Sequence, residues 1–314
     1  MAHVIKPPRL RPGDVIGVIA PASPMKPELL DAGVRYLEGL GYRIKLGRYI
    51  FEKHGYLAGT DAQRARDFNG MFRDRRIKAI ICARGGYGTP RLLPRIDYDA
   101  IRRHPKIFVG YSDLTALQLA IFRHTGLITF SGPMVAAEMG RGLDPFTEES
   151  FWRVISSPQA FGELVRPNGE SYEAVYHGRV RGRLLGGCLS LIAPIAGSRH
   201  MPGVAGSIFF VEDVGEAVYK WDRYFVQLRE LGLFKKMAGF LLGQTTDCTP
   251  PDGEPSLTMD DLMRDFVKPL KIPALAHLDY GHGRVKYTMP IGVRAELEVS
   301  ARRTRVAIAE AAVV

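Results

Sequence analysis

The first 130 residues alternate short apolar runs with helix-like segments, and this alternation constrains the fold more than any other feature of the chain. The runs are rich in β-branched and aromatic residues, which is typical of buried strands. Strands that alternate with helices predict a parallel sheet covered on both faces. The strands are expected over 14–20, 42–46, 77–82, 107–109 and 127–130, and the helices over 26–40, 61–72 and 148–155.

Strand signals dominate the second half of the chain. Residues 178–184 alternate polar and apolar side chains, and the tail over 287–314 has few helix signals, so antiparallel strands are expected in the tail. Further strands are expected over 207–211, 238–242 and 274–278. One helix is expected over 217–231, with four large apolar side chains on one face: Val218, Trp221, Phe225 and Leu228.

Residues 156–176 mix prolines and glycines with polar residues, which is typical of a connection between domains. A chain of 314 residues is long for one domain and comfortable for two. We therefore predict an N-terminal doubly wound, mostly parallel α/β domain over 1–157 and a connection over 158–177. A C-terminal, β-rich and barrel-like α+β domain is expected over 178–314.

Charge and cysteine content argue against several classes of protein. The net charge is +10, from 43 basic and 33 acidic residues, but the basic residues are scattered and form no nucleic-acid platform. Cys82, Cys188 and Cys248 are far apart and odd in number, so no disulfide framework is expected. Residues 1–11 lack the apolar core of a signal peptide, and no run reaches the roughly 18 apolar residues of a membrane span. We expect a soluble cytoplasmic protein without a nucleic-acid or membrane partner.

The segment 106–114 ends a buried strand at Gly110 and delivers Ser112 to the start of a helix. A side chain at this turn lies beyond the carboxyl end of a strand and beside the free N–H groups of a helix N-terminus, which favour negative charge. Ser112 is therefore a candidate nucleophile. The alternative is that Ser112 or Asp113 only caps the helix.

A glycine-rich loop, Arg84-Gly85-Gly86-Tyr87-Gly88, follows the strand over 77–82. Its spacing does not match the G-x-G-x-x-G fingerprint of dinucleotide-binding proteins. The loop is either a structural turn or a donor loop, in which the Gly86 N–H faces the same substrate oxygen as the N–H that follows Ser112.

Glu212 and His282 also stand where apolar strands end. Alone, each has an ordinary explanation as a strand-end carboxylate or a turn histidine. Together with Ser112 they supply a nucleophile, a base and an acid, and such triads occur in several chain orders on unrelated folds. Glu216 is an alternative acid. A metal site at His277, Asp279 and His282 is poorly supported, because no fourth ligand is visible.

Five motifs of the chain, in their order along the sequence, resemble those of the LD-carboxypeptidases. These are serine peptidases that include muramoyltetrapeptide carboxypeptidases and microcin C immunity peptidases. The resemblance spans residues 17–292. One departure is Cys188, where the family pattern has asparagine. The motifs are Arg84-Gly85-Gly86-Tyr87-Gly88, Gly110-Tyr111-Ser112-Asp113, Leu185-Gly186-Gly187, Val211-Glu212-Asp213-Val214-Gly215-Glu216 and Tyr280-Gly281-His282-Gly283.

The resemblance implies a role for each residue that matches the family's motifs. Ser112 would be the nucleophile, His282 the general base and Glu212 the acid that orients it. The N–H groups of Gly86 and Asp113 would form the oxyanion hole. Arg84 and Tyr87 are weaker candidates for substrate binding, with Arg84 facing the terminal carboxylate of a peptide.

The resemblance also implies a cytoplasmic homodimer that needs no metal or other cofactor. Its substrate would be a murein tetrapeptide, from which it releases the terminal D-alanine during cell-wall recycling. One alternative is an immunity-type peptidase that cleaves a peptidyl or aminoacyl nucleotide. Those relatives usually carry a longer loop in their C-terminal half, for which this chain has no obvious room. An alternative of another class is a non-catalytic α/β module that binds phosphates or nucleotides at the Gly85-Gly86 loop.

Overall fold

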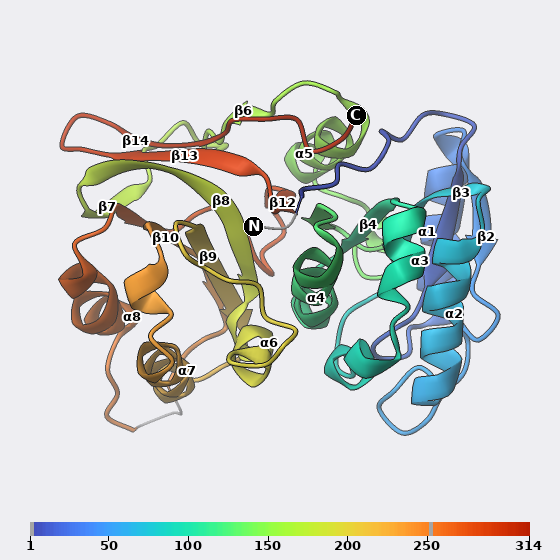
Figure 1. The fold of residues 1–314 in the computed structure, drawn as a ribbon, viewed down its shortest axis with the longest axis horizontal. Helices are drawn as coiled ribbons and strands as arrows, with labels where there is room; N and C mark the ends of the chain where they lie inside the picture. Colours follow the sequence, from blue (N-terminus) through green and yellow to red (C-terminus); the bar gives the residue numbers. More distant parts are fainter. Residues whose placement is uncertain (1–2, 251–253) are drawn as a thin grey trace.

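The computed structural model describes residues 3–250 and 254–314, and its first half contains the expected parallel sheet (Figure 1). The strand order is β12-β5-β4-β3-β1-β2, and all neighbours except β12 and β5 run parallel. The five parallel strands are β1 (Val15–Ile19), β2 (Arg43–Leu46), β3 (Ile77–Cys82), β4 (Ile107–Gly110) and β5 (Thr129–Ser131).

Helices cover both faces of this sheet (Figure 1). The helix α2 begins with a reciprocal capping box between Thr60 and Gln63. Its aromatic side chains Phe68 and Phe72 pack on Phe108 of β4, with ring centroids 5.4 Å and 6.3 Å away. The helices of this half are α1 (Pro27–Gly39), α2 (Asp61–Arg73), α3 (Tyr98–Arg103), α4 (Thr115–Thr125) and α5 (Pro145–Ser156).

The sixth strand of the first sheet comes from the far end of the chain. β12 (Met289–Ile291) runs antiparallel to β5, with Met289 opposite Ser131. The tail was expected to be antiparallel, which is confirmed, but this strand extends the first sheet instead of the second. Because β12 starts at the carboxyl end of β5, the loop before it, which carries His282, is held at the carboxyl edge of the first sheet.

The second half forms an eight-stranded sheet that curls into a half-barrel (Figure 1). Its order is β6-β14-β13-β8-β9-β10-β11-β7, with β8, β9, β10 and β11 parallel and the outer pairs antiparallel. The strands are β6 (Gly162–Glu163), β7 (Glu173–Tyr176), β8 (Gly178–Cys188), β9 (Ile208–Val214), β10 (Gly239–Thr246), β11 (Ala274–Ala276), β13 (Arg294–Val299) and β14 (Thr304–Ile308). This is the β-rich, barrel-like architecture expected from the sequence.

The segment between the two halves is not an irregular linker. Its short strands β6 and β7 pair with β14 and β11 at the two edges of the second sheet. The sequence predicted a connection here because proline and glycine interrupt every apolar run. The segment is ordered instead by pairing with strands that are remote in the sequence.

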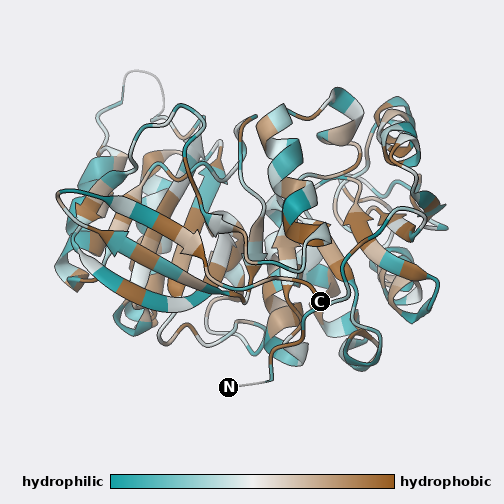
Figure 2. Ribbon diagram, turned by 90° about the horizontal axis from the view of Figure 1, so that it is seen from above, coloured by the Kyte–Doolittle hydropathy of each residue, from teal (hydrophilic) through white to brown (hydrophobic). Residues whose placement is uncertain are grey.

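Three helices pack against the second sheet: α6 (Leu189–Ile192), α7 (Val218–Glu230) and α8 (Met259–Leu262). The buried residues of α7 are the four predicted from its spacing, Val218, Trp221, Phe225 and Leu228. Figure 2 shows that hydrophilic and hydrophobic residues alternate along the arched strands of the second sheet. Across residues 3–250 and 254–314, no helix has the length and apolar character needed to cross a membrane.

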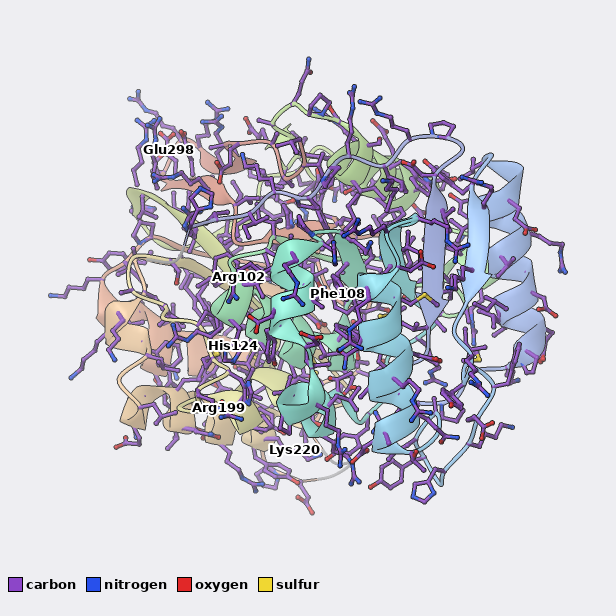
Figure 3. The ribbon with its side chains drawn as sticks, turned by 45° about the vertical axis from the view of Figure 1, so that its right-hand side comes forward. Arg102, Phe108, His124, Arg199, Lys220 and Glu298 are labelled. Atoms are coloured by element: carbon purple, nitrogen blue, oxygen red, sulfur yellow. The ribbon has the colours of Figure 1, made fainter. Side chains whose placement is uncertain are left out.

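Two histidines meet where the two halves of the molecule pack together. His124, at the end of α4, lies with its Nε2 atom 3.1 Å from Nδ1 of His200, and its ring centroid is 4.2 Å from that of Tyr98, with the two rings tilted by 34°. Figure 3 shows His124 with Arg102 and Arg199 on this side of the molecule. Burial first, and the charges of Arg123 and Arg199 second, lower the pKa of His124 below its usual value. The pKa of His200 is lowered by burial first and by His124 second.

This pair predicts an acid-dependent loss of stability. A histidine whose folded pKa is depressed takes up its proton more readily when unfolded, so the folded state loses stability as the pH falls below about 6.5. The double variant His124→Gln/His200→Gln is expected to lose fewer degrees of Tm than the wild type between pH 7.5 and pH 5.5. Thermal unfolding at the two pH values checks this. The exposed His177→Gln change is the control, and an unchanged pH dependence in the double variant would contradict the assignment.

Candidate active site

Ser112 lies on a tight turn between β4 and α4. Its φ of 64° places it in the left-handed region, an uncommon conformation for a non-glycine residue that clusters at functional sites. The turn is close: a side chain at Gly110 would lie 2.7 Å from Leu114 Cγ, so a glycine is required there. The turn therefore presents the Ser112 hydroxyl beyond the carboxyl end of β4, as a nucleophile elbow does.

The glycine-rich loop after β3 packs directly against Ser112. A methyl group at Gly85 would lie 3.3 Å from Ser112 Oγ, and one at Gly86, whose φ is 117°, would overlap Ser23 Oγ. Within the described residues, the N–H groups of Gly86 and Asp113 donate no hydrogen bond. Two backbone donors thus remain free beside the serine.

The Asp113 side chain connects the serine turn to the glycine-rich loop. It is fully buried and accepts hydrogen bonds from the N–H groups of Gly88 at 3.2 Å and Thr89 at 2.8 Å. Burial raises the pKa of this carboxyl above its usual value, although the two N–H groups oppose the shift. Asp113 therefore fixes the position of one candidate donor relative to the other.

Glu212 and His282 form a contact pair in the second half of the molecule. Glu212 lies on β9 with no exposed surface, and its Oε2 is 2.6 Å from Nδ1 of His282. The His282 side chain is 14% exposed, so one edge of the imidazole is open. A hydrogen bond to Nδ1 leaves Nε2 free to accept a proton, which is the arrangement a general base requires.

Gln244 on β10 holds the histidine loop in place. Its Oε1 accepts from the Gly283 N–H at 2.7 Å, and its Nε2 donates to the carbonyl of Val285 at 2.8 Å. Its backbone N–H also donates to the carbonyl of Tyr280 at 2.8 Å. These three hydrogen bonds flank His282 on both sides and restrict where its ring can lie.

A second polar cluster lies beside the imidazole. The Tyr111 ring is 4.9 Å from the His282 ring and 3.9 Å from the Lys286 ammonium. The Tyr111 hydroxyl and Lys286 both donate to Glu138 Oε1, and the Met134 N–H donates to Glu138 Oε2. These three hydrogen bonds compensate the negative charge of Glu138. Its carboxylate is therefore not available to pair with other cations of the site.

The candidate residues Arg84, Gly86, Ser112 and His282 line one cavity of about 470 Å³. It lies between the carboxyl ends of the strands of both sheets, where α/β folds usually bind ligands. Ser112 and His282 both line it but make no hydrogen bond to each other within the described residues, as is common before substrate binds. Its other lining residues include Lys26, Arg84, Gly85, Gly86, Tyr111, Glu138, Arg141 and Val214.

Several candidates are separated from the cavity by the structure. Tyr87 does not line it, and its exposed ring packs edge-on against Tyr56 at 5.6 Å. Glu216 contacts Lys220 at 3.0 Å, whereas Glu212 contacts His282. His277 contacts Glu173 at 3.0 Å, so it does not gather with His282 as the metal hypothesis requires. Across the described residues there is no cluster of three or more His, Cys, Asp or Glu side chains suited to a metal.

Cys188, the departure from the family pattern, lies next to the acid and not in the cavity. Its backbone pairs with Glu212, and its N–H donates to Thr115 Oγ1 at 3.1 Å. Its thiol donates to Asp213 Oδ1 at 3.3 Å. Burial first, and the charge of Glu212 second, raise the pKa of Asp213 to about 6. The cysteine thus supports a buried carboxyl beside the candidate acid.

The sequence did not predict Glu138, Arg141, Lys286 or Gln244 as site residues. Arg141 also lines a neighbouring cavity of about 280 Å³, which continues past Glu138 toward Arg284. A usable signal did exist for Glu138 and Arg141, because they follow the carboxyl end of β5, where ligands of such sheets bind. No sequence signal marks Gln244 or Lys286, since their role depends on contacts with distant loops.

A two-domain fold with a serine elbow and a buried Glu–His pair defines a class of hydrolase, and comparison with known proteins gives the family. Sequence profiles of the LD-carboxypeptidase N-terminal and C-terminal domains match residues 16–132 and 181–297. The chain belongs to the LD-carboxypeptidase family of serine peptidases.

Relatives and solved structures cover nearly the whole chain. The chain is 39% identical over 297 residues to a probable murein peptide carboxypeptidase of Bacillus subtilis, covering 94% of this chain and 92% of the relative. An MccF-like protein of Bacillus anthracis superposes with a TM-score of 0.89 at 28% identity, covering 98% and 100%. A muramoyltetrapeptide carboxypeptidase of Oxalobacter formigenes gives 0.83 at 31% identity, covering 94% and 99%.

Proposed function

We propose that this chain releases the terminal D-amino acid from L,D-linked murein tetrapeptides with a Ser112–His282–Glu212 triad. The observation that carries the proposal is the 2.6 Å contact between Glu212 and His282, beside the cavity that Ser112 also lines. Relatives named for murein peptides support the substrate. Family membership favours this enzyme over a non-catalytic phosphate-binding module.

In the proposed reaction, Ser112 Oγ attacks the carbonyl carbon of the L-residue while Nε2 of His282 takes the hydroxyl proton. Glu212 holds the imidazole in the tautomer that accepts this proton. The oxyanion accepts hydrogen bonds from Gly86 and Asp113. The C–N bond then breaks, and His282 returns the proton to the departing amine. Water hydrolyses the acyl-serine and regenerates Ser112.

Cations in the cavity suit a substrate with carboxylates. Lys26, Arg84 and Arg141 line it, and none of them forms an ion pair within the described residues. Arg84 adjoins the donor loop, and its Nη1 donates only to the carbonyl of Pro24 at 3.3 Å. We assign Arg84 to the terminal carboxylate of the peptide. Arg141 lies in the wall between the two cavities and suits a carboxylate farther along the peptide.

Replacing Arg84 with glutamine should test this assignment. A hydrogen bond to a charged group contributes about 1.5–3 kcal/mol, so kcat/KM for a peptide ending in free D-alanine should fall about 10- to 100-fold. The same peptide ending in D-alanine amide should be affected much less. Exposed Arg35→Gln is the matched control. An equal loss with both peptides would argue against carboxylate recognition by Arg84.

A specific observation keeps the immunity-type activity as a second candidate. MccF structures superpose on 98% of this chain with TM-scores up to 0.89, and one of them is a complex of MccF with glutamyl sulfamoyl guanosine. Parallel assays with a murein tetrapeptide and with an aminoacyl sulfamoyl nucleoside separate the two candidates. Faster cleavage of the tetrapeptide supports the murein assignment, and faster cleavage of the nucleoside conjugate replaces it.

We further infer a homodimer in the cytoplasm, working without a metal or other cofactor. These inferences rest on the family resemblance. Sedimentation of the purified chain tests the dimer, and activity retained in EDTA tests independence from metals.

A further inference from the structure

A second cavity of about 360 Å³ lies away from Ser112, between the end of α4 and the middle of β8. Its volume falls in the range of small-molecule sites, about 300–1,000 Å³. Part of its wall is apolar, from Phe122, Leu185 and Pro202. The polar part is dominated by four arginines: Arg123, Arg181, Arg183 and Arg294.

The four arginines come from three separate parts of the chain, and two of them, Arg123 and Arg294, have no carboxylate partner for their side chains among the described residues. No acidic residue lines it. Arg181 forms an ion pair with Glu296 at 2.6 Å, and Arg183 pairs with Glu310 at 3.7 Å and donates to the carbonyl of Gly292 at 2.7 Å. Arg123 and Arg294 form no side-chain ion pair or hydrogen bond with any described residue.

Gathering like charges around one cleft costs free energy, and Glu296 and Glu310 offset that cost for Arg181 and Arg183 only. A cleft lined by positive charges concentrates anions. The planar guanidinium group can donate two parallel hydrogen bonds to a pair of phosphate or carboxylate oxygens. The two guanidinium groups without a carboxylate partner, Arg123 and Arg294, favour a dianion over a monoanion. The apolar wall favours a ligand that also carries a hydrophobic group.

We propose that this cavity is a binding site for an organic phosphate, with the phosphate held by Arg123 and Arg294 and its apolar part lying against Phe122 and Leu185. The site is distinct from the candidate active site, because the two cavities share no lining residue.

The two elements that form the site also reach the candidate active site. α4 begins just after Ser112 and ends near Arg123. β8 carries Arg183 in its middle, and its last residue, Cys188, pairs with Glu212. A ligand that orders these two segments would therefore act on elements that position both the nucleophile and the acid.

The test uses the full-length protein and phenyl phosphate as the probe, at constant ionic strength adjusted with sodium chloride. Phenyl phosphate should raise the Tm of the wild type in a concentration-dependent way, as binding to the folded state does. The variant Arg123→Gln/Arg294→Gln should need at least about tenfold more probe for the same shift, because each charged hydrogen bond contributes about 1.5–3 kcal/mol. Exposed Arg35→Gln/Arg302→Gln is the matched control.

Two further probes separate the parts of the proposal. Inorganic phosphate should shift Tm less than phenyl phosphate if the apolar wall contributes, and benzoate should shift it less if a dianion is required. Equal shifts in the wild type and in the Arg123/Arg294 variant would overturn the site, since they would reflect general anion effects. If the variant lowers Tm without the probe, isothermal titration below both transitions gives the same comparison.

Discussion

Ser112→Ala is expected to abolish peptide hydrolysis while leaving the fold intact. Removing the nucleophile of a Ser–His–acid triad typically costs about 10⁴- to 10⁶-fold in kcat, because the remaining groups act as one unit with it. The hydroxyl makes no hydrogen bond within the described residues, so its loss removes no structural contact. Alanine should tolerate the left-handed backbone conformation of this turn about as well as serine does. Release of D-alanine and thermal unfolding measure the two expectations.

Two comparisons sharpen this result. Ser157→Ala, at the end of α5 and outside the cavity, should leave turnover close to the wild type. A Tm for Ser112→Ala within a degree or two of the wild type would attribute lost turnover to chemistry. Activity of Ser112→Ala within tenfold of the wild type would end the serine-nucleophile account.

Glu212→Gln should lower kcat by about 10³- to 10⁴-fold, whereas Glu216→Gln should be nearly silent. The glutamine keeps the size of the side chain, but it cannot stabilise the imidazolium that forms when His282 takes the serine proton. Glu216 contacts Lys220 of α7 and not His282, so its replacement removes a partly exposed ion pair and leaves the contact to the imidazole intact. Steady-state kinetics of both variants gives a direct comparison between residues four positions apart.

The reverse ranking would show that the contact in the described structure is not the one used in the reaction. If both variants stayed active, His282 would need no orienting carboxylate, and the triad would reduce to a Ser–His pair.

The elements around Ser112 were predictable from sequence because the information is local. A strand that ends in Gly110, a serine and a helical pattern define the elbow within nine residues. The glycine-rich loop and the strand ends at Glu212 and His282 follow from the rule that sites form at the carboxyl ends of strands. The contact between Glu212 and His282 was a hypothesis at that stage, since the two residues are 70 positions apart.

The position of β12 could not be predicted from its own residues. Three residues with Pro290 in the middle carry a weak strand signal, and proline is tolerated there because β12 is the edge strand of the first sheet. The pairing of Met289 with Ser131 is decided by the packing of the two halves. That pairing brings the His282 loop to Ser112, so a weak local signal controls an important part of the site.

The hydrogen bonds made by the buried polar side chains around the site could not be predicted from local sequence patterns either. Gln244, Glu138 and Lys286 are ordinary polar residues in the sequence, and they gain their roles from hydrogen bonds to loops 40 to 150 positions away. Buried polar groups must be satisfied by partners, but sequence does not tell which partners the fold will supply. Gln244 and Lys286 were therefore missed for the same physical reason, whereas Glu138 was missed although it follows the carboxyl end of β5.

The central claim is that this chain hydrolyses an L,D-amide bond through Ser112. The most direct test incubates the wild type with a murein tetrapeptide ending in D-alanine, in the presence of EDTA, and measures free D-alanine by chiral chromatography. The account predicts time-dependent release by the wild type, none by Ser112→Ala, and little release of L-alanine from the diastereomer that ends in L-alanine. Absence of D-alanine with folded wild-type protein, or equal release by Ser112→Ala, would contradict it.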